Sequence, residues 1–217
     1  WFFRNNMKVH ICAPDIHPGD AVGNHCLGIA RMCSRIGIES VLYARNFPAF
    51  HPEICEIKEL ELSISPEDVL VLSYSIFDPW LECLLQLPGR KICYFHGVTD
   101  PDLLRENEPE TALLCEKSIA QLPDLARFDT LIINSLHTAQ TLPPEVTTKV
   151  TIIPPVFADM PVFGRVAKAT SDNRQRKMLL VVGRVVSHKR IEDAIELLAD
   201  IRTLGYDYNI AVVGSMP

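Results

Sequence analysis

The sequence predicts an α/β fold built on a doubly wound parallel sheet, followed by the beginning of a second domain of the same class. Short apolar runs rich in β-branched residues alternate with segments of helical periodicity, which is typical of a parallel sheet covered by helices. The chain has 217 residues, of which 47% are hydrophobic, and this is enough for a full core. The alternation stops at a polar, proline-marked stretch and then begins again, which indicates the second domain.

The first domain is predicted over residues 7–156. Its strands are the β-rich apolar runs, expected at 8–13, 40–44, 68–72, 91–95, 130–134 and 150–153. Its helices have apolar residues at helical spacing and are expected at 26–36, 80–87 and 103–125, the last interrupted or started afresh near Pro109. Gly37 is expected to end the first helix, and Ser135 to cap the helix after the fifth strand. A polar loop is predicted from 14 to 24.

A linker is predicted over 157–176, because Pro154 and Pro155 precede it and a polar run ends it. After the linker we expect a strand, a helix and a second strand, at 177–182, from about 187, and at 209–213. One strand, one helix and one strand cannot cover both faces of a sheet. We therefore expect the second domain, 177–217, to be incomplete.

Composition argues against several classes of protein. A formal net charge of −6 disfavours a nucleic-acid binder that relies on bulk charge. The seven cysteines are scattered and form no C-x-x-C pair, which favours buried reduced thiols in a cytosolic protein; one reactive thiol is the alternative. No apolar run reaches the roughly 18 residues that a membrane span needs. Met7 before the first strand has the appearance of a natural start, so residues 1–6 are interpreted as an extension.

A basic turn lies between a predicted strand and a predicted helix, in the segment Gly183-Arg184-Val185-Val186-Ser187-His188-Lys189-Arg190. The helix dipole disfavours cations near a helix start by roughly 0.3–1 kcal/mol each. A sequence that breaks this local rule often does so for a ligand. Backbone N–H groups at the helix start, together with Arg184 and Lys189, would neutralise a diphosphate. The alternative is a solvated basic turn.

A glycine-bearing loop, residues 18–25, follows the first strand at its carboxyl end. Open α/β sheets bind ligands at that edge. The loop does not match the G-x-G-x-x-G dinucleotide fingerprint, which weakens an NAD-binding interpretation. The alternative is a plain surface loop rich in Gly and Asp.

A histidine, His96, ends another strand at the same edge, in the segment Tyr94-Phe95-His96-Gly97-Val98-Thr99-Asp100-Pro101. An imidazole there can titrate near neutral pH and donate to a ligand hydroxyl or to developing charge. A structural role is the alternative. Asp15 and His17 lack a third ligand at suitable spacing, so no metal site is predicted.

The basic turn resembles the start of the donor domain in the large retaining glycosyltransferase family 4, whose two Rossmann-like domains form the GT-B fold. In that family the matching Arg and Lys hold the diphosphate of a nucleotide sugar, which implies this role for Arg184 and Lys189. Gly214, at the end of the next strand, matches a family glycine whose loop lies near the nucleotide.

The glycine-bearing loop is similar to the loop of family 4 acceptor domains that faces the interdomain cleft. The resemblance implies that Gly19 lies at the donor diphosphate and that Asp20, Gly23 and Asn24 line the cleft.

The histidine segment is similar to a His-Asn-Ile-Thr-Pro loop of some bacterial members. This similarity implies a catalytic role for His96 and cleft positions for Thr99 and Asp100. The segment departs from that pattern in having Gly97 in place of Asn and an additional residue, Asp100, before the proline.

The resemblance implies a GT-B glycosyltransferase that moves a sugar from a UDP- or GDP-sugar to a saccharide or lipid-linked acceptor, with retention. It implies no metal cofactor, since fixed cations and helix dipoles can stabilise the leaving diphosphate. The expected location is cytoplasmic, with peripheral contact at the cytoplasmic face of a membrane, and no nucleic-acid partner is expected. The present chain alone is expected to be inactive. Two rivals remain open: a non-catalytic acceptor- or partner-binding module without the donor domain, and another nucleotide-binding α/β enzyme such as a dehydrogenase or epimerase.

Overall fold

The computed structural model describes residues 7–17, 19–51, 53–146, 150–155 and 177–214. The chain divides into two compact units. One is formed by Trp1–Thr99 with Leu113–Met160, and the other by Asp100–Ala112 with Pro161–Pro217. The domain bounds drawn from the sequence stay predictions, and the predicted linker 157–176 lies outside the described residues.

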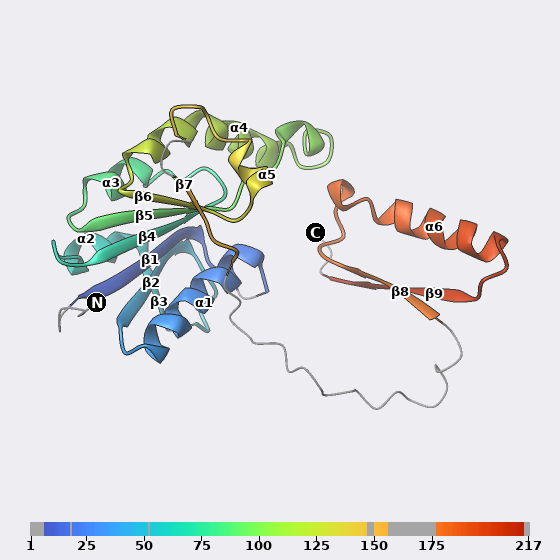
Figure 1. Ribbon diagram of the computed structural model, residues 1–217, viewed down its shortest axis with the longest axis horizontal. Helices are drawn as coiled ribbons and strands as arrows, with labels where there is room; N and C mark the ends of the chain where they lie inside the picture. Colours follow the sequence, from blue (N-terminus) through green and yellow to red (C-terminus); the bar gives the residue numbers. More distant parts are fainter. Residues whose placement is uncertain (1–6, 18, 52, 147–149, 156–176, 215–217) are drawn as a thin grey trace. The chain divides into compact units, whose positions relative to one another are not determined.

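The first unit contains a seven-stranded sheet in which every neighbouring pair is parallel, in the order β3-β2-β1-β4-β5-β6-β7 (Figure 1). The strands are β1 (Lys8–Asp15), β2 (Glu39–Asn46), β3 (Ile54–Glu56), β4 (Val69–Tyr74), β5 (Arg90–Phe95), β6 (Thr130–Ile133) and β7 (Val150–Ile152). From β1 the chain builds outward to β2 and β3 on one side, and from β4 to β7 on the other. The order therefore reverses between β1 and β4, which is the topological switch point of a doubly wound sheet.

Helices cover both faces of this sheet. The α-helices of this stretch of chain are α1 (Ala21–Arg35), α2 (Leu60–Ser63), α3 (Leu81–Gln86), α4 (Pro109–Gln121) and α5 (Leu136–Ala139). Three short 3-10 turns lie along the same stretch: η1 (Ile57–Glu59), η2 (Pro101–Leu103) and η3 (Leu122–Arg127). Of these elements, η2 and the beginning of α4 fall within Asp100–Ala112, which is part of the second unit.

Two hydrophobic cores lie on opposite faces of the sheet. One contains Cys26 and Cys33 of α1 packed with alternate residues of β1, β2 and β4. The other contains buried leucines from α2, α3 and η3 packed on the remaining alternate residues. Because both faces are buried, the inner strands are almost continuously apolar, and this property made them predictable from the sequence.

The predicted strands of the sheet are confirmed, and the structure adds β3, whose three residues are too few for a periodic signal. The predicted loop from 14 to 24 is wrong at both ends. Strand β1 continues to Asp15, and α1 begins at Ala21 behind the N-cap Asp20. The predicted start of the first helix is too late in the sequence, because the opening turn, with Gly23 and Asn24, carries few apolar residues. The predicted cap at Ser135 is confirmed, since its hydroxyl accepts from the backbone N–H of Thr138.

The second unit contains a two-stranded parallel sheet, β8 (Lys177–Val182) and β9 (Tyr208–Val213), with α6 (Ile191–Thr203) packed on it. The expected helix start near Ser187 is wrong. Residues Ser187–Lys189 form a 3-10 turn, η5, and Arg190 then takes a left-handed conformation with φ 50° before α6 begins. Alternate β8 side chains on the face away from α6 are exposed: Met178, Leu180 and Val182.

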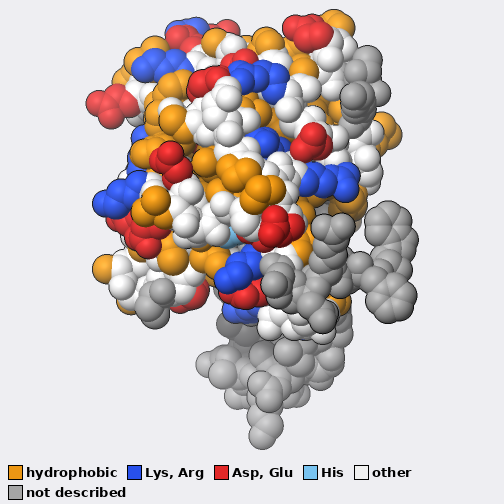
Figure 2. Space-filling view, turned by 90° about the vertical axis from the view of Figure 1, so that its left-hand side faces the viewer, with side chains coloured by type: hydrophobic (Ala, Val, Ile, Leu, Met, Phe, Trp, Pro, Cys, Tyr) orange, Lys and Arg blue, Asp and Glu red, His pale blue; other side chains and the backbone are white. Residues whose placement is uncertain are grey.

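Acidic and basic side chains are interspersed over the face of the first unit that Figure 2 shows, with apolar groups between them. No helix among the described residues is long and apolar enough to cross a lipid bilayer. The seven cysteines are free thiols, five of them buried.

Candidate functional site at the switch point

The candidate site lies where β1, β4 and β5 end, at the carboxyl edge beside the switch point. The chain leaves β1 through the glycine-bearing loop and returns along α1, and His96 follows β5 directly. Parallel strands place their carboxyl ends at one edge, so segments far apart in sequence meet here.

The loop after β1 approaches α1 very closely at Gly23. A Cβ added to Gly23 would lie 2.1 Å from the carbonyl oxygen of His17 and 2.7 Å from its nitrogen. Real Cβ atoms do not come this close to backbone atoms, so only glycine fits while the loop keeps this path. Gly23 therefore sets the path of the loop, and its predicted position at the cleft stays a prediction.

Two polar side chains of this segment hold the loop in place. One carboxylate oxygen of Asp20 accepts hydrogen bonds from the N–H groups of Val22 and Gly23, at 3.0 and 3.3 Å, and so caps α1. The Asn24 side chain accepts from the N–H of Gly19 at 3.1 Å, where the backbone has φ 89°. Both side chains keep the glycine-bearing loop against the start of the helix.

His96 is held by residues that follow the neighbouring strand β6. The side-chain amide of Asn134 donates to the His96 carbonyl at 2.9 Å, and Thr138 in turn donates to the Asn134 side chain at 2.5 Å. Gly97 follows with φ 93°, a conformation that favours glycine. The sharp turn after β5 therefore explains why this chain has Gly97 where the resembled loop has Asn.

The His96 ring belongs to a compact polar cluster with His25, Ser73 and Tyr94. Its Nε2 lies 2.9 Å from the Ser73 hydroxyl, and that hydroxyl lies 3.4 Å from Nδ1 of His25. The two imidazoles stand edge to face with centroids 4.9 Å apart, and the Tyr94 ring lies 4.1 Å from His25 and 4.7 Å from His96. The Tyr94 hydroxyl donates to the Ile153 carbonyl at 2.5 Å. The cluster thus joins α1, β4, β5 and the end of β7.

Both imidazoles are neutral at physiological pH. Burial lowers the pKa of His25 to about 4, and burial together with the neighbouring His25 lowers the pKa of His96 to about 4, although Asp20 acts in the opposite direction. The expectation that His96 titrates near neutral pH is therefore wrong, because sequence alone did not reveal its burial. A neutral imidazole offers one hydrogen-bond donor and one acceptor, which suits hydroxyl groups better than it suits phosphate charge.

These pKa values predict a loss of stability in mild acid. Unfolded histidines bind protons below about pH 6.5, whereas the folded pair stays neutral until about pH 4, so stability is lost as the pH falls through this window. We expect a loss on the order of 3 kcal/mol, about half of the full linkage value because the His96 ring retains some solvent.

The buried carboxyl of Asp78 acts in the opposite direction, because burial raises its pKa to about 6. Its protonation as the pH falls removes the free-energy cost of burying a charge and so adds stability. Urea unfolding of Asp78→Asn should therefore show a steeper loss between pH 7 and 4.5 than the unchanged protein. A free energy of unfolding that stays flat in Asp78→Asn over this range would contradict the assignment of neutral imidazoles.

Thr99 and Asp100, which were predicted to line the cleft, are both exposed. Asp100 caps the 3-10 turn η2 by accepting from the N–H of Asp102 at 3.0 Å. This carboxylate has a local structural role, and the cleft role of both residues stays a prediction.

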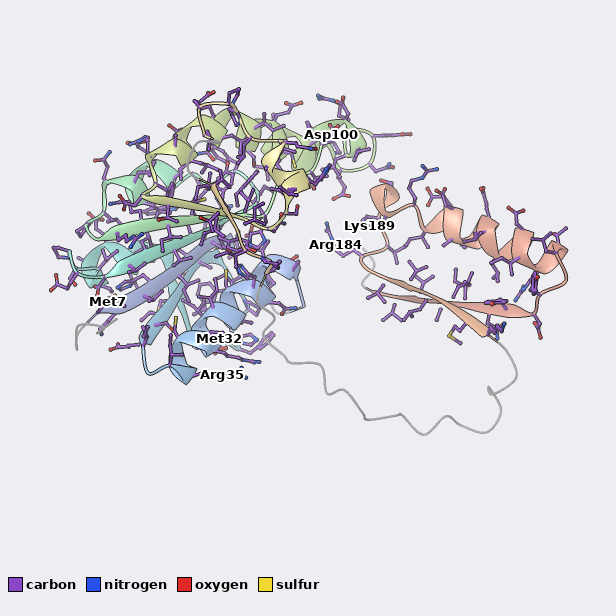
Figure 3. All side chains as sticks on the ribbon, viewed as in Figure 1. Met7, Met32, Arg35, Asp100, Arg184 and Lys189 are labelled. Carbon is purple, nitrogen blue, oxygen red and sulfur yellow. The ribbon has the colours of Figure 1, made fainter. Side chains whose placement is uncertain are left out.

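In the second unit, Arg184 and Lys189 lie at the carboxyl end of the two-stranded sheet (Figure 3). Both are exposed, and neither forms an ion pair within the part of the chain that the structure describes. Arg190, in contrast, pairs with Asp193 in the first turn of α6. Among the described residues these two cations at one sheet edge have no carboxylate partner, and their role at a diphosphate stays a prediction.

Gly214 lies in the same region, directly after β9. A Cβ on Gly214 would stand 1.8 Å from the Gly183 carbonyl oxygen, so glycine is required for the two strand ends to approach. Its predicted proximity to a nucleotide is not tested by this contact. Among the described residues, no group of three or more His, Cys, Asp or Glu side chains is arranged to hold a metal ion.

Sequence reasoning missed His25 and Ser73, which complete the polar cluster. His25 is the last residue of the segment defined as the glycine-bearing loop, and Ser73 interrupts an apolar strand near its carboxyl end. A polar residue at that position of a buried strand is the signal that could have identified Ser73.

The seven-stranded parallel sheet, covered on both faces and reversing beside β1, defines a Rossmann-like α/β fold and confirms the predicted fold class. No family model matches the sequence, and no curated protein is similar to it in sequence. Among solved structures, the chain is similar to an alpha-glucosyltransferase in complex with UDP and a 13-mer DNA containing a central A:G mismatch. The TM-score is 0.53 at 13% identity, and the similar region covers 95% of this chain and 56% of that one. At this identity the similarity shows the fold.

Proposed function

We propose that this chain carries the acceptor-side domain and the beginning of the donor-side domain of a nucleotide-sugar-dependent glycosyltransferase. The observation that carries the proposal is the neutral His25–Ser73–His96 cluster at the switch point of a sheet whose fold matches a UDP-bound glucosyltransferase. Sugar acceptors present uncharged hydroxyl groups, and neutral imidazoles can hydrogen bond to them without a charge penalty. The whole-protein activity is part of the proposal, because the chain spans 56% of the length of that structure.

In the proposed reaction, His96 contacts the reacting hydroxyl, while Arg184 and Lys189 stabilise the diphosphate as it leaves. Two fixed cations and the backbone N–H groups around η5 would supply positive potential where negative charge develops. The donor would be UDP- or GDP-linked, no metal would be needed, and transfer would retain the anomeric configuration. We further propose a saccharide or lipid-linked acceptor and a cytoplasmic location with peripheral membrane contact.

Replacing Lys189 with alanine in the full-length protein should weaken binding of the donor nucleotide by about tenfold to a hundredfold. A hydrogen bond from an ammonium to a phosphate is worth roughly 1.5–3 kcal/mol. Isothermal titration calorimetry with UDP and with GDP would measure the loss.

Lys177→Ala is the matched control, since this lysine lies in the same unit at the opposite end of β8 and stacks over the Tyr208 ring. The proposed role fails if both variants bind the nucleotide as the unchanged protein does. Binding of NAD(H) in place of UDP or GDP would instead favour a dehydrogenase or epimerase.

A further inference from the structure

The Asn134 side chain connects the end of β6 to the backbone of His96. The last register pair between β5 and β6 is Phe95 with Ile133. One residue further along each chain segment, the Asn134 amide donates to the His96 carbonyl at 2.9 Å. The His96 N–H in turn donates to the Tyr74 carbonyl of β4 at 2.9 Å. Asn134 therefore extends the contact between β5 and β6 by one residue, to the residue that carries the imidazole of the candidate site.

The orientation of the Asn134 amide follows from its partners. The His96 carbonyl can only accept, so the Asn134 nitrogen faces it, and the Asn134 oxygen faces the Thr138 hydroxyl at 2.5 Å. An amide oxygen cannot donate, so the Thr138 hydroxyl is the donor to it. The Ser135 hydroxyl lies 3.0 Å from Thr138 Oγ1 and must donate in that contact, because Thr138 has no second hydroxyl hydrogen. One set of donor directions thus satisfies every contact of this group.

This group has a fixed end and acts on a backbone with little restraint of its own. Thr138 is only 6% exposed, and its N–H donates to Ser135 Oγ at 3.2 Å, so the anchor lies in the protein interior. Gly97, which follows His96, has φ 93°, and a residue without Cβ leaves the backbone wide conformational freedom. The position of the His96 carbonyl therefore depends on the hydrogen bond from Asn134.

We propose that Asn134 is a positioning residue, whose amide, oriented by Thr138, sets the backbone of His96 and thereby the place of its imidazole in the candidate site. The His96 ring packs against two other rings, with centroids 4.9 Å from His25 and 4.7 Å from Tyr94, so a rotation of the backbone changes both contacts. The consequence for sugar transfer rests on the proposed function, whereas the positioning of the ring does not.

¹H–¹³C NMR of protein labelled in its histidine rings tests the positioning, because the two neighbouring rings shift the ring protons of His96. The signals of His96 are identified by their loss in His96→Ala. In Asn134→Ala we expect these signals to move toward the positions of the exposed histidines. Asn134→Asp keeps the shape of the side chain but turns a carboxylate oxygen toward the carbonyl, so it should move them as well.

Asn46→Ala is the matched control, since Asn46 ends β2 at the same sheet edge and its amide donates to Asp15. It should leave the His96 signals in place. Thr138→Val removes the hydroxyl that orients Asn134 and should move them, whereas Thr138→Ser keeps the hydroxyl and should not. Unmoved His96 signals in a folded Asn134→Ala variant would overturn the proposal. If that variant does not fold, unmoved signals in Thr138→Val would overturn it.

Rates of sugar transfer by the full-length protein test the consequence for the reaction. We expect Asn134→Ala to lower kcat by about tenfold to a hundredfold with little change in KM, the usual cost of a small misplacement at a site. In a His96→Ala background the same replacement should cost nothing more, because its effect passes through the imidazole. Equal losses in both backgrounds would overturn the proposal. If the unchanged protein transfers no sugar, the proposed function is wrong, and the NMR signals alone decide the positioning.

Discussion

Replacing Gly23 with alanine is expected to destabilise the first unit by about 3 kcal/mol, near the upper end of what overpacking costs. The added methyl carbon would lie 2.1 Å from the His17 carbonyl oxygen, and the obstacle is backbone that cannot rotate away as a side chain can. Either α1 or the glycine-bearing loop must move, and the hydrogen bonds accepted by the Asp20 and Asn24 side chains would be strained with it. Urea denaturation followed by circular dichroism would measure the loss.

Gly37→Ala provides the matched control at the other end of the same helix. That glycine also has positive φ, 74°, but a methyl group there would meet nothing within 4 Å. It should cost only about 1 kcal/mol, the usual penalty of a left-handed conformation. Equal losses in the two variants would show that the close approach to His17 is not what makes Gly23 necessary.

Replacing His96 with alanine in the full-length protein is expected to lower kcat/KM for sugar transfer by about a hundredfold. Removing one preorganised hydrogen-bond donor from a catalytic site typically costs 10²–10³ in rate. Because the pKa of His96 is lowered to about 4, the loss should be the same at pH 6 and pH 8. His96→Gln retains an N–H donor and should recover part of the rate.

His137→Ala is the appropriate control for His96, since this histidine is exposed on α5 near the same edge. It should keep transfer within about twofold of the unchanged protein. A His96→Ala variant that transfers sugar equally well would remove this residue from the proposed mechanism.

The parallel sheet could be predicted from the sequence because buried strands such as β4 and β5 are continuous apolar runs with clear ends. The start of α1 could not, because Asp20, Gly23 and Asn24 have the composition of a loop while the structure uses them as a cap and a first turn. The start of α6 could not be predicted either, because the left-handed conformation of Arg190 separates the 3-10 turn η5 from the helix.

The candidate site was predictable only in part. His96 was predicted because it ends a strand at the edge where α/β sheets bind ligands. Its partners were not, because Ser73 and His25 are 48 residues apart and meet only when β1 and β4 become neighbours. The shift of both histidine pKa values also depends on burial, which no short motif encodes.

The central claim is that this protein transfers sugar from a nucleotide donor, and mass spectrometry of the reaction products tests it most directly. The protein isolated from its source cells would be incubated with UDP- and GDP-sugars and a set of saccharide and lipid-linked acceptors. We predict that one UDP or GDP is released for each glycosyl residue by which an acceptor gains mass, and that Lys189→Ala slows this release. If no donor is consumed with any acceptor, or if the protein oxidises or reduces NAD(H) instead, the proposed function is wrong.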